Sequence, residues 1–289
     1  MLPGREMKKM LELLRDMFHY EFMTRALTVG ILVSLCASLL GVSMVLKRYS
    51  MIGDGLSHVG FAAMAGAAAC GIAPLWAAIP VCIAAAVIML KISERSRLTG
   101  DASTAIVCSG ALAIGVMVIS LSSGMNTDVN NYMFGSILSL SAQDALISRV
   151  LSVAVIIVFM IFYNRIFAVT FDETFARATG ARAGAYNTVL AVLTAVTVVI
   201  GMRMMGALLI SSLVIFPSLS AMRVCKRYRS VIICSVVISV LCFIAGITLS
   251  FAKSTPAGAS VVCVNLAVFA VFAAFGAVKK KIKIKEKSQ

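Results

Sequence analysis

Histidine and acidic residues are scarce in this sequence. Its 289 residues include two histidines, one tryptophan, five prolines and 12 acidic residues. The phosphate-binding motif GxxxxGK[ST] is absent, so the chain cannot hydrolyse a nucleotide by that route. We therefore expect a protein that is not an enzyme, and whose energy comes from an ion gradient or from a partner protein.

Paired cysteines are absent as well. The eight cysteines form no CxxC pair and are scattered through apolar runs, whereas thiolate metal sites usually show paired spacing. Cysteine in apolar surroundings behaves as a small buried hydrophobe. We therefore predict packing roles for all eight: Cys36, Cys70, Cys82, Cys108, Cys225, Cys234, Cys242 and Cys263.

The N-terminal region shows no cleavable signal peptide. The first apolar run begins near Arg25 and lacks a small-residue cleavage site. Residues 1–25 mix both signs of charge and carry apolar residues such as Leu13 and Met17 at helical spacing. This pattern predicts an amphipathic helix at the membrane interface. We assign no role to His19, which lies within it.

Apolar residues dominate the composition. Hydrophobic residues make up 61% of the chain and its mean hydropathy is +1.00, above a typical soluble domain. Several runs approach the roughly 20 apolar residues that a helix needs to cross a bilayer. The sequence predicts an all-α membrane bundle of eight or nine transmembrane helices over residues 26–278. The expected spans are 26–46, 57–71, 74–91, 102–122, 145–163, 185–201, 205–222, 230–250 and 257–278.

The second expected span, 57–71, is short and rich in alanine and glycine. Helices in lipid gain little from the hydrophobic effect, and small side chains let their backbones pack closely. We therefore expect this span inside the bundle, away from lipid, with its polar residues in the interior of the protein.

The positions of the positive charges are explained by membrane topology, and they indicate no nucleic-acid partner. The net charge is +14, from 26 basic and 12 acidic residues, and the basic residues lie at the ends of apolar runs. The connections that carry them are expected in the cytoplasm, as is the C-terminus, and nine spans then place the N-terminus outside. The tail, residues 279–289, is rich in lysine. We expect it to lie in the cytoplasm, where anionic membrane lipid attracts it.

Asp54 and His58 form the pair most suggestive of chemistry. They lie four residues apart, so a helix places them on one face, one turn apart. A carboxylate and a neutral imidazole bind borderline divalent ions such as Zn²⁺ or Mn²⁺. Ionisable residues within a membrane are costly, and they therefore usually indicate a functional site. In the alternative interpretation, Asp54 caps a helix beginning at Gly55 and His58 bonds to a neighbour.

A second candidate is the helix around Pro217. This proline lies within an apolar run and frees a backbone carbonyl near Leu213. Ser211 and Ser212 precede it, and a kinked, hydroxyl-rich helix suits the wall or gate of a transport pathway. Ordinary packing, with the serines bonded back to their own helix, is an equal alternative.

The connection at about 164–184 contains the stretch FDETFARATG. Asp172 can cap a short helix, and Gly180 suits the position after its last turn. Phe171 and Phe175 would lie on one side of this helix. Such a helix suits docking of a cytosolic partner, although composition does not separate this role from that of a solvated connector.

Several blocks occur in order along the chain: RYSMIGDGLSH, GALAIGVMVISL, YMFGSILSLSAQD, FDETFARATG and MRMMGALLISSLVIFPSLSAMR, closed by STPAG. In this order they resemble the permease subunits of bacterial ABC importers for zinc, manganese and iron, of the ABC-3 type. The likeness covers about residues 22–278. It implies a type II-like importer permease fold and a multi-pass location in the bacterial cell membrane.

The resemblance also implies partners and site residues. Such permeases form a homodimer, bind a cytosolic ATPase dimer and receive metal from an extracytoplasmic metal-binding protein. They carry no permanent cofactor, and the transported ion would be Zn²⁺, or Mn²⁺ or Fe²⁺. The resemblance assigns metal binding to Asp54 and His58. It assigns ATPase coupling to Asp172, Glu173, Phe175, Ala176 and Gly180.

Two departures from the family pattern leave the metal open. Ser254 stands where relatives often carry aspartate, and Ser109 lies near the position of a histidine in some zinc-type relatives. An ion-coupled secondary transporter of a metal or small solute is the alternative function. Such carriers often contain paired broken helices, and the span of Pro217 is the proline-broken one that we single out. An intramembrane hydrolase would need a second catalytic group beside Asp54 or His58.

Overall fold

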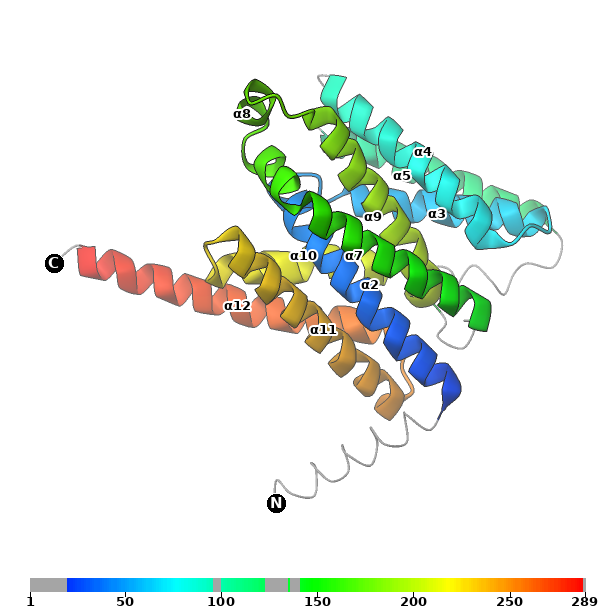
Figure 1. The fold of residues 1–289 in the computed structure, drawn as a ribbon. Coiled ribbons are helices and arrows are strands. Elements are labelled where there is room, and N and C mark those ends of the chain that lie inside the picture. The colour runs from blue at the N-terminus through cyan, green and yellow to red at the C-terminus, as the bar shows by residue number, and fades with distance from the viewer. Residues whose placement is uncertain (1–19, 96–99, 123–134, 136–140, 288–289) are drawn as a thin grey trace, which may run out of the picture.

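The computed structural model describes residues 20–95, 100–122, 135 and 141–287. Its regular elements within these ranges are all helices (Figure 1), which confirms the all-α prediction. They are α2 (Glu21–Leu46), α3 (Ile52–Ala69), α4 (Pro74–Arg95), α5 (Gly100–Leu121), α7 (Ala142–Phe171), α8 (Glu173–Ala178), α9 (Ala183–Met205), α10 (Ala207–Val224), α11 (Tyr228–Lys253) and α12 (Ala257–Lys287).

Eight of the described helices are long and apolar enough to cross a membrane. They are α2, α4, α5, α7, α9, α10, α11 and α12, so the predicted count of eight or nine spans is supported. The helix α3 does not reach the same hydropathy because Asp54, His58 and several glycines lie in its 18 residues. It therefore needs protein neighbours on most sides, as the sequence predicted.

Helix α3 packs against α4, α5, α9 and α10, while α2 packs against α7, α9, α10 and α11. Figure 1 shows α3 beside the antiparallel pair α4 and α5. Glycine permits these approaches: a Cβ on Gly55 would lie 2.9 Å from Met89 Cε, and one on Gly60 would lie 2.5 Å from Met202 Cε. Small residues therefore seat α3 deeply among its neighbours.

Most helices differ from the predicted spans by a few residues at one or both ends, and three of these differences move a predicted boundary between regions. Helix α2 begins at Glu21, so part of the expected interfacial segment belongs to the first long helix, while residues 1–19, including His19, lie outside the described residues. Helix α7 continues to Phe171 and shortens the loop expected from residue 164. Helix α12 continues to Lys287 through the basic tail. Hydropathy indicates where a helix leaves the lipid. The helix itself can continue for further turns made of polar residues.

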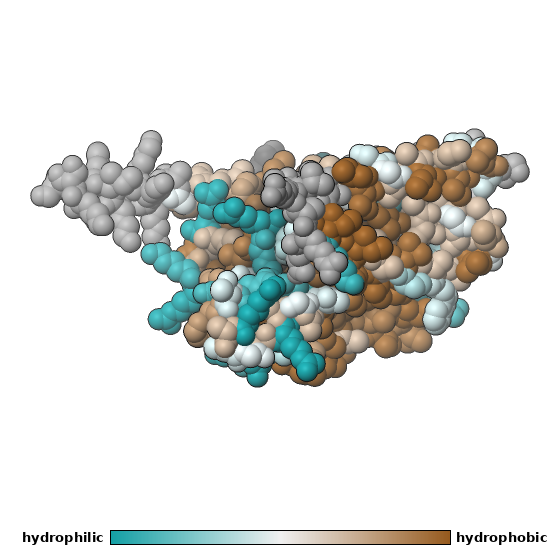
Figure 2. Space-filling view, turned by 90° about the horizontal axis from the view of Figure 1, so that it is seen from above, coloured by the Kyte–Doolittle hydropathy of each residue, from teal (hydrophilic) through white to brown (hydrophobic). Residues whose placement is uncertain are grey.

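The basic connections lie toward one end of the bundle. In Figure 1 the C-terminal end of α12 and the α10–α11 turn lie on the left, the C-terminal end of α2 lies left of the centre and the short helix α8 lies at the top. The N-terminal ends of α2 and α7 lie toward the lower right. Figure 2 shows hydrophilic side chains gathered on one part of the visible face and hydrophobic ones over the rest. The placement of the basic connections at one end agrees with successive helices that cross the membrane in alternate directions.

Candidate metal centre

Asp54 and His58 lie on α3, one turn apart. The helix begins at Ile52, with Met51 as an N-cap residue that makes no side-chain capping bond. The alternative in which Asp54 caps a helix from Gly55 is therefore wrong, because the helix starts three residues earlier. Asp54 instead lies in the first turn. There its negative charge interacts favourably with the positive N-terminal end of the helix dipole.

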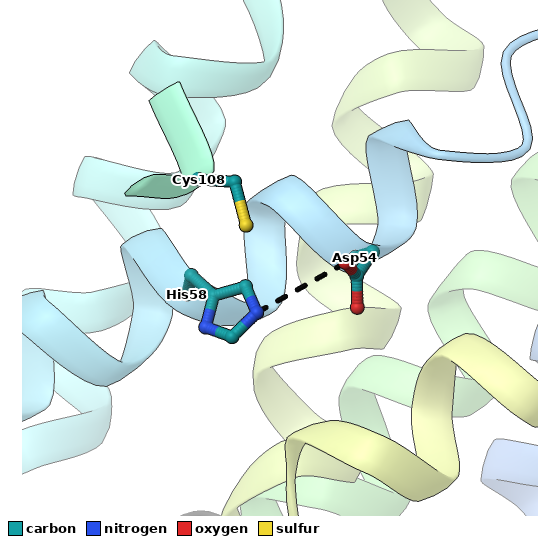
Figure 3. Close-up of side chains that lie close together, drawn as sticks. All are labelled: Asp54, His58 and Cys108. Carbon is teal, nitrogen blue, oxygen red and sulfur yellow. Dashed lines mark ion pairs between the residues drawn. The ribbon is translucent and has the colours of Figure 1, made fainter. Parts of the chain in front are cut away.

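The two side chains face each other and remain partly accessible. His58 Nε2 lies 4.0 Å from Asp54 Oδ2, and the side chains are 20% and 33% exposed, respectively. Figure 3 shows the imidazole and the carboxylate on the same side of α3. Partial exposure allows an ion to reach the ligand atoms, which a fully packed pair would prevent.

Cys108 is a third potential ligand, contributed by α5. One ligand atom each from Cys108, Asp54 and His58 lies within 4.8 Å of the others, and Figure 3 shows the sulfur directed toward the pair. The prediction that every cysteine only fills space does not account for this position. No local motif signals it, because the residue stands 50 positions beyond His58 and depends on the packing of α5 against α3.

Ser211 connects the metal centre to α10. Its hydroxyl donates a hydrogen bond to Asp54 Oδ1 at 3.0 Å, across 157 residues of sequence. One carboxylate oxygen of Asp54 thus faces Ser211 and the other faces His58. The adjacent Ser212 is different: it is buried and bonds back to the Leu209 carbonyl at 2.8 Å. The structure therefore brings Ser211, and not Ser212, to the metal centre.

Pro217 lies buried within α10, which continues on both sides of it from Ala207 to Val224. The hydroxyl of Ser218 donates to the Val214 carbonyl at 2.9 Å. A Cβ on Gly41 of α2 would lie only 2.2 Å from this same carbonyl oxygen. This part of α10 is tightly packed against α2, about two turns from Ser211, so Pro217 does not touch the Asp54–His58 pair.

The short helix that was predicted in the connection after α7 is present as α8. The Asp172 carboxylate accepts a hydrogen bond from the Phe175 amide at 2.8 Å, as an N-cap does. Thr179 ends the helix and Gly180 follows with a φ of +81°, in the left-handed region that favours glycine. Ala176 is buried against Val169 and Ala183.

Polar contacts hold α8 to two long helices. Glu173 accepts from Lys47 Nζ at 3.4 Å, from Asn187 Nδ2 at 3.2 Å and from Arg177 Nη2 at 2.6 Å. Lys47, only 7% exposed, also donates to the Asn187 side-chain oxygen. Burial would raise the Glu173 pKa, but the hydrogen bonds from Asn187 and Arg177 and the charge of Lys47 together lower it below the ordinary value.

Two aromatic side chains are exposed at the α7–α8 junction. Phe175 on α8 is 64% exposed, and Phe171, which is the last residue of α7 and not part of the short helix, is 59% exposed, although aromatic side chains are usually largely buried. Lys47 directly follows α2, and a short connection joins it to the first turn of α3. The Glu173–Lys47 contact is therefore close along the chain to Asp54.

The candidate metal centre offers one carboxylate, one imidazole and one thiol, with a serine hydroxyl bonded to the carboxylate. These are the donor types that Zn²⁺ accepts, and Mn²⁺ and Fe²⁺ share the oxygen and nitrogen donors. A metal ion held by these three groups would have coordination positions left for water or for a further donor.

Comparison with known proteins places the chain among transport proteins. A sequence model described as the ABC 3 transport family matches residues 19–276. The chain is 28% identical over 250 residues to the high-affinity zinc uptake system membrane protein ZnuB of Haemophilus influenzae, covering 86% of this chain and 96% of that protein. It is 26% identical over 260 residues to the manganese import system permease protein ScaB of Streptococcus gordonii, covering 90% and 93%.

The fold is similar to that of a solved transporter. The structure of PsaBC from Streptococcus pneumoniae in complex with Fab matches with a TM-score of 0.81 and 26% identity, covering 91% of this chain and 94% of that one. The similarity therefore extends over almost the whole length of both chains.

Proposed function

The chain belongs to the ABC 3 transport family, and from this membership we propose that it is the permease subunit of an ATP-driven importer of divalent metal ions. Zinc is the foremost substrate, with manganese and iron as the other members of the class. The family membership confirms the resemblance of the ordered sequence blocks, and the chain is a multi-pass membrane protein with eight helices of sufficient length and apolarity among its described residues.

The observation that carries this proposal is the Asp54–His58 pair on a helix seated between other membrane helices. A carboxylate and an imidazole inside a membrane bundle are costly, by at least ~2.5 kcal/mol for a charge at the bilayer centre. Coordination of a passing cation offsets this cost. Few protein ligands hold the ion weakly enough for release on the far side.

Energy for transport would come from a cytosolic ATPase dimer that docks on α8. The exposed Phe171 and Phe175 provide apolar contact area, and the Glu173–Lys47 contact supports transmission of its motion to the α2–α3 connection. Two copies of the permease would surround one central path, and an extracytoplasmic metal-binding protein would deliver the ion. Open coordination positions at a three-ligand site support the homodimer.

The test is metal uptake into proteoliposomes that contain the permease, together with an ATPase that copurifies with it. We expect uptake that requires ATP inside the vesicles, with Zn²⁺ competing more strongly than Mn²⁺ or Fe²⁺. Uptake that follows an imposed proton or sodium gradient without ATP would instead support an ion-coupled secondary transporter.

The docking role of α8 has its own test. Reversing charge at Asp172 and Arg177 removes the helix cap and the Arg177–Glu173 contact. We expect ATP hydrolysis to continue while metal uptake falls, because the two are no longer linked. Hydrolysis and uptake that remain coupled as in the unaltered protein would place docking elsewhere.

A further inference from the structure

We propose that Cys108 binds the transported ion as a thiolate, together with Asp54 and His58, and makes the site prefer zinc-like ions over manganese. This inference deepens the proposed function, on which it rests, because it concerns the same ion at the same site. It assigns the choice of metal to a residue on α5, whereas the predicted pair lies entirely on α3.

The distances suit a three-ligand zinc site. Zinc bonds of about 2.0–2.3 Å in a tetrahedral arrangement separate neighbouring ligand atoms by roughly 3.3–3.8 Å. The ligand atoms of Asp54, His58 and Cys108 already lie within 4.8 Å of one another. Changes of side-chain rotamer, without movement of the helices, can supply the remaining approach.

Cys108 differs from the cysteines that pack within the bundle. Cys36 and Cys82 are buried, and their thiols donate to the backbone carbonyls of Ser152 and Leu56. Cys108 is half-buried, and its sulfur is directed toward His58 and Asp54 (Figure 3). The next residue, Ser109, has an exposed side chain. Cys108 is thus placed with its sulfur beside Asp54 and His58.

A thiolate changes the preference of the site. Carboxylate and imidazole ligands accept Zn²⁺, Fe²⁺ and Mn²⁺, but thiolate favours softer ions, whereas Mn²⁺ suits carboxylate, carbonyl and water oxygens. On binding, the Cys108 sulfur forms a bond to the metal and the thiol proton passes to solvent, as for other cysteine ligands. Cys108 therefore strengthens zinc binding more than manganese binding.

The experiment uses Co²⁺ as a spectroscopic substitute for Zn²⁺ in the purified full chain. Thiolate ligation gives Co²⁺ a near-ultraviolet charge-transfer band, which we expect in the unaltered protein and not in Cys108→Ser. Cys70→Ser is the matched control, since Cys70 is exposed at the end of α3, away from the metal centre. Displacement of Co²⁺ by Zn²⁺ and by Mn²⁺ then gives the affinity for each metal.

We expect Cys108→Ser to weaken Zn²⁺ binding at least about tenfold, since even outer contacts of metal ligands contribute 10–100-fold. Mn²⁺ binding is expected to change less than about threefold, because oxygen donors suit Mn²⁺. Bound Co²⁺ without the thiolate band in the unaltered protein would overturn the proposal, whether or not the variant folds. An unchanged zinc-to-manganese preference in a folded Cys108→Ser protein would overturn it equally.

The variants Asp54→Asn and His58→Ala separate this proposal from the proposed function. If they abolish binding of all three metals while Cys108→Ser changes nothing, the permease site stands and only the thiolate role fails. If they bind Co²⁺ and Zn²⁺ as the unaltered chain does, or if the unaltered chain binds neither metal, the site itself is misplaced and both proposals fail.

Discussion

Asp54 is oriented by two neighbours from different parts of the chain. His58 faces one carboxylate oxygen from the same helix, and Ser211 donates to the other from α10. Hydrogen bonds to a ligating carboxylate fix its direction and tune its basicity. In the proposed site, Ser211 would therefore orient Asp54 toward the ion without contacting the ion itself.

Replacing Ser211 by alanine removes this hydrogen bond. We expect metal affinity to fall by about tenfold, at the lower end of the effect of outer contacts on metal sites, as measured by titration of the purified chain with Zn²⁺. The matched control is Ser212→Ala, because the Ser212 hydroxyl bonds only to its own helix at Leu209. Equal effects of the two variants would show that the contact of Ser211 with Asp54 is unimportant.

Asp54 and His58 are predictable from the sequence because they share one helix at a spacing of one turn. Ser211 and Ser212 are equivalent in the sequence, and only the packing of α10 on α3 distinguishes them. Cys108 could not be found from spacing, since its place depends on how α5 lies against α3. Site residues that share one helix can be predicted from their spacing in the sequence. Contacts between residues on different helices cannot.

At the scale of elements, close helix packing and a small polar network place the two functional regions. Gly41 allows α2 to approach the Val214 carbonyl of α10, and Lys47, Glu173 and Asn187 join α2, α8 and α9. The first contact stabilises the bundle, and the second ties the proposed docking helix to it.

The variant Gly41→Ala tests the close approach. The new Cβ would lie 2.2 Å from the Val214 backbone oxygen, so the helices must separate, and we expect a loss of about 1–3 kcal/mol in the free energy of unfolding. In Gly66→Ala, where no heavy atom lies within 4 Å, the better helix propensity should stabilise the protein by about 0.5–1 kcal/mol. Thermal unfolding in detergent measures both, and a Gly41→Ala protein as stable as Gly66→Ala would contradict this packing.

The lowered pKa of Glu173 predicts a pH dependence. Its ionised form is favoured in the folded protein, so the group contributes stability above its ordinary pKa of 4.5 and loses that contribution as the pH falls through the lowered value. At neutral pH we expect the unaltered protein to have a higher melting temperature than Glu173→Gln. The difference should shrink as the pH falls below 4.5, through the lowered pKa of Glu173.

The control for this comparison is Glu21→Gln, which removes a carboxylate paired with Arg25 at the exposed start of α2. Exposed pairs contribute little to stability, so its melting temperature should stay close to that of the unaltered protein at neutral pH. A Glu173→Gln difference that grows toward acid pH would contradict the assignment of the lowered pKa to this network.

At the scale of the whole molecule, composition and periodicity sufficed for the membrane class, the helical fold and the approximate number of spans. The capped helix α8 was also predictable, because Asp172 and Gly180 carry local signals. Helix ends beyond the lipid were not, as α7 and α12 show by continuing past the predicted limits. Hydropathy predicts which residues lie in lipid and which lie in water. It does not predict the residue at which a helix ends.

The central claim is that a divalent ion passes through the bundle by way of Asp54 and His58. The most direct measurement is ATP-dependent uptake of radioactive zinc into proteoliposomes containing the permease with its ATPase, compared among the unaltered protein, Asp54→Ala and His58→Ala. We predict that each variant inserts and assembles but no longer takes up zinc, because ionisable residues within a membrane mark the pathway of the ion. Uptake at the normal rate by both variants would contradict the account.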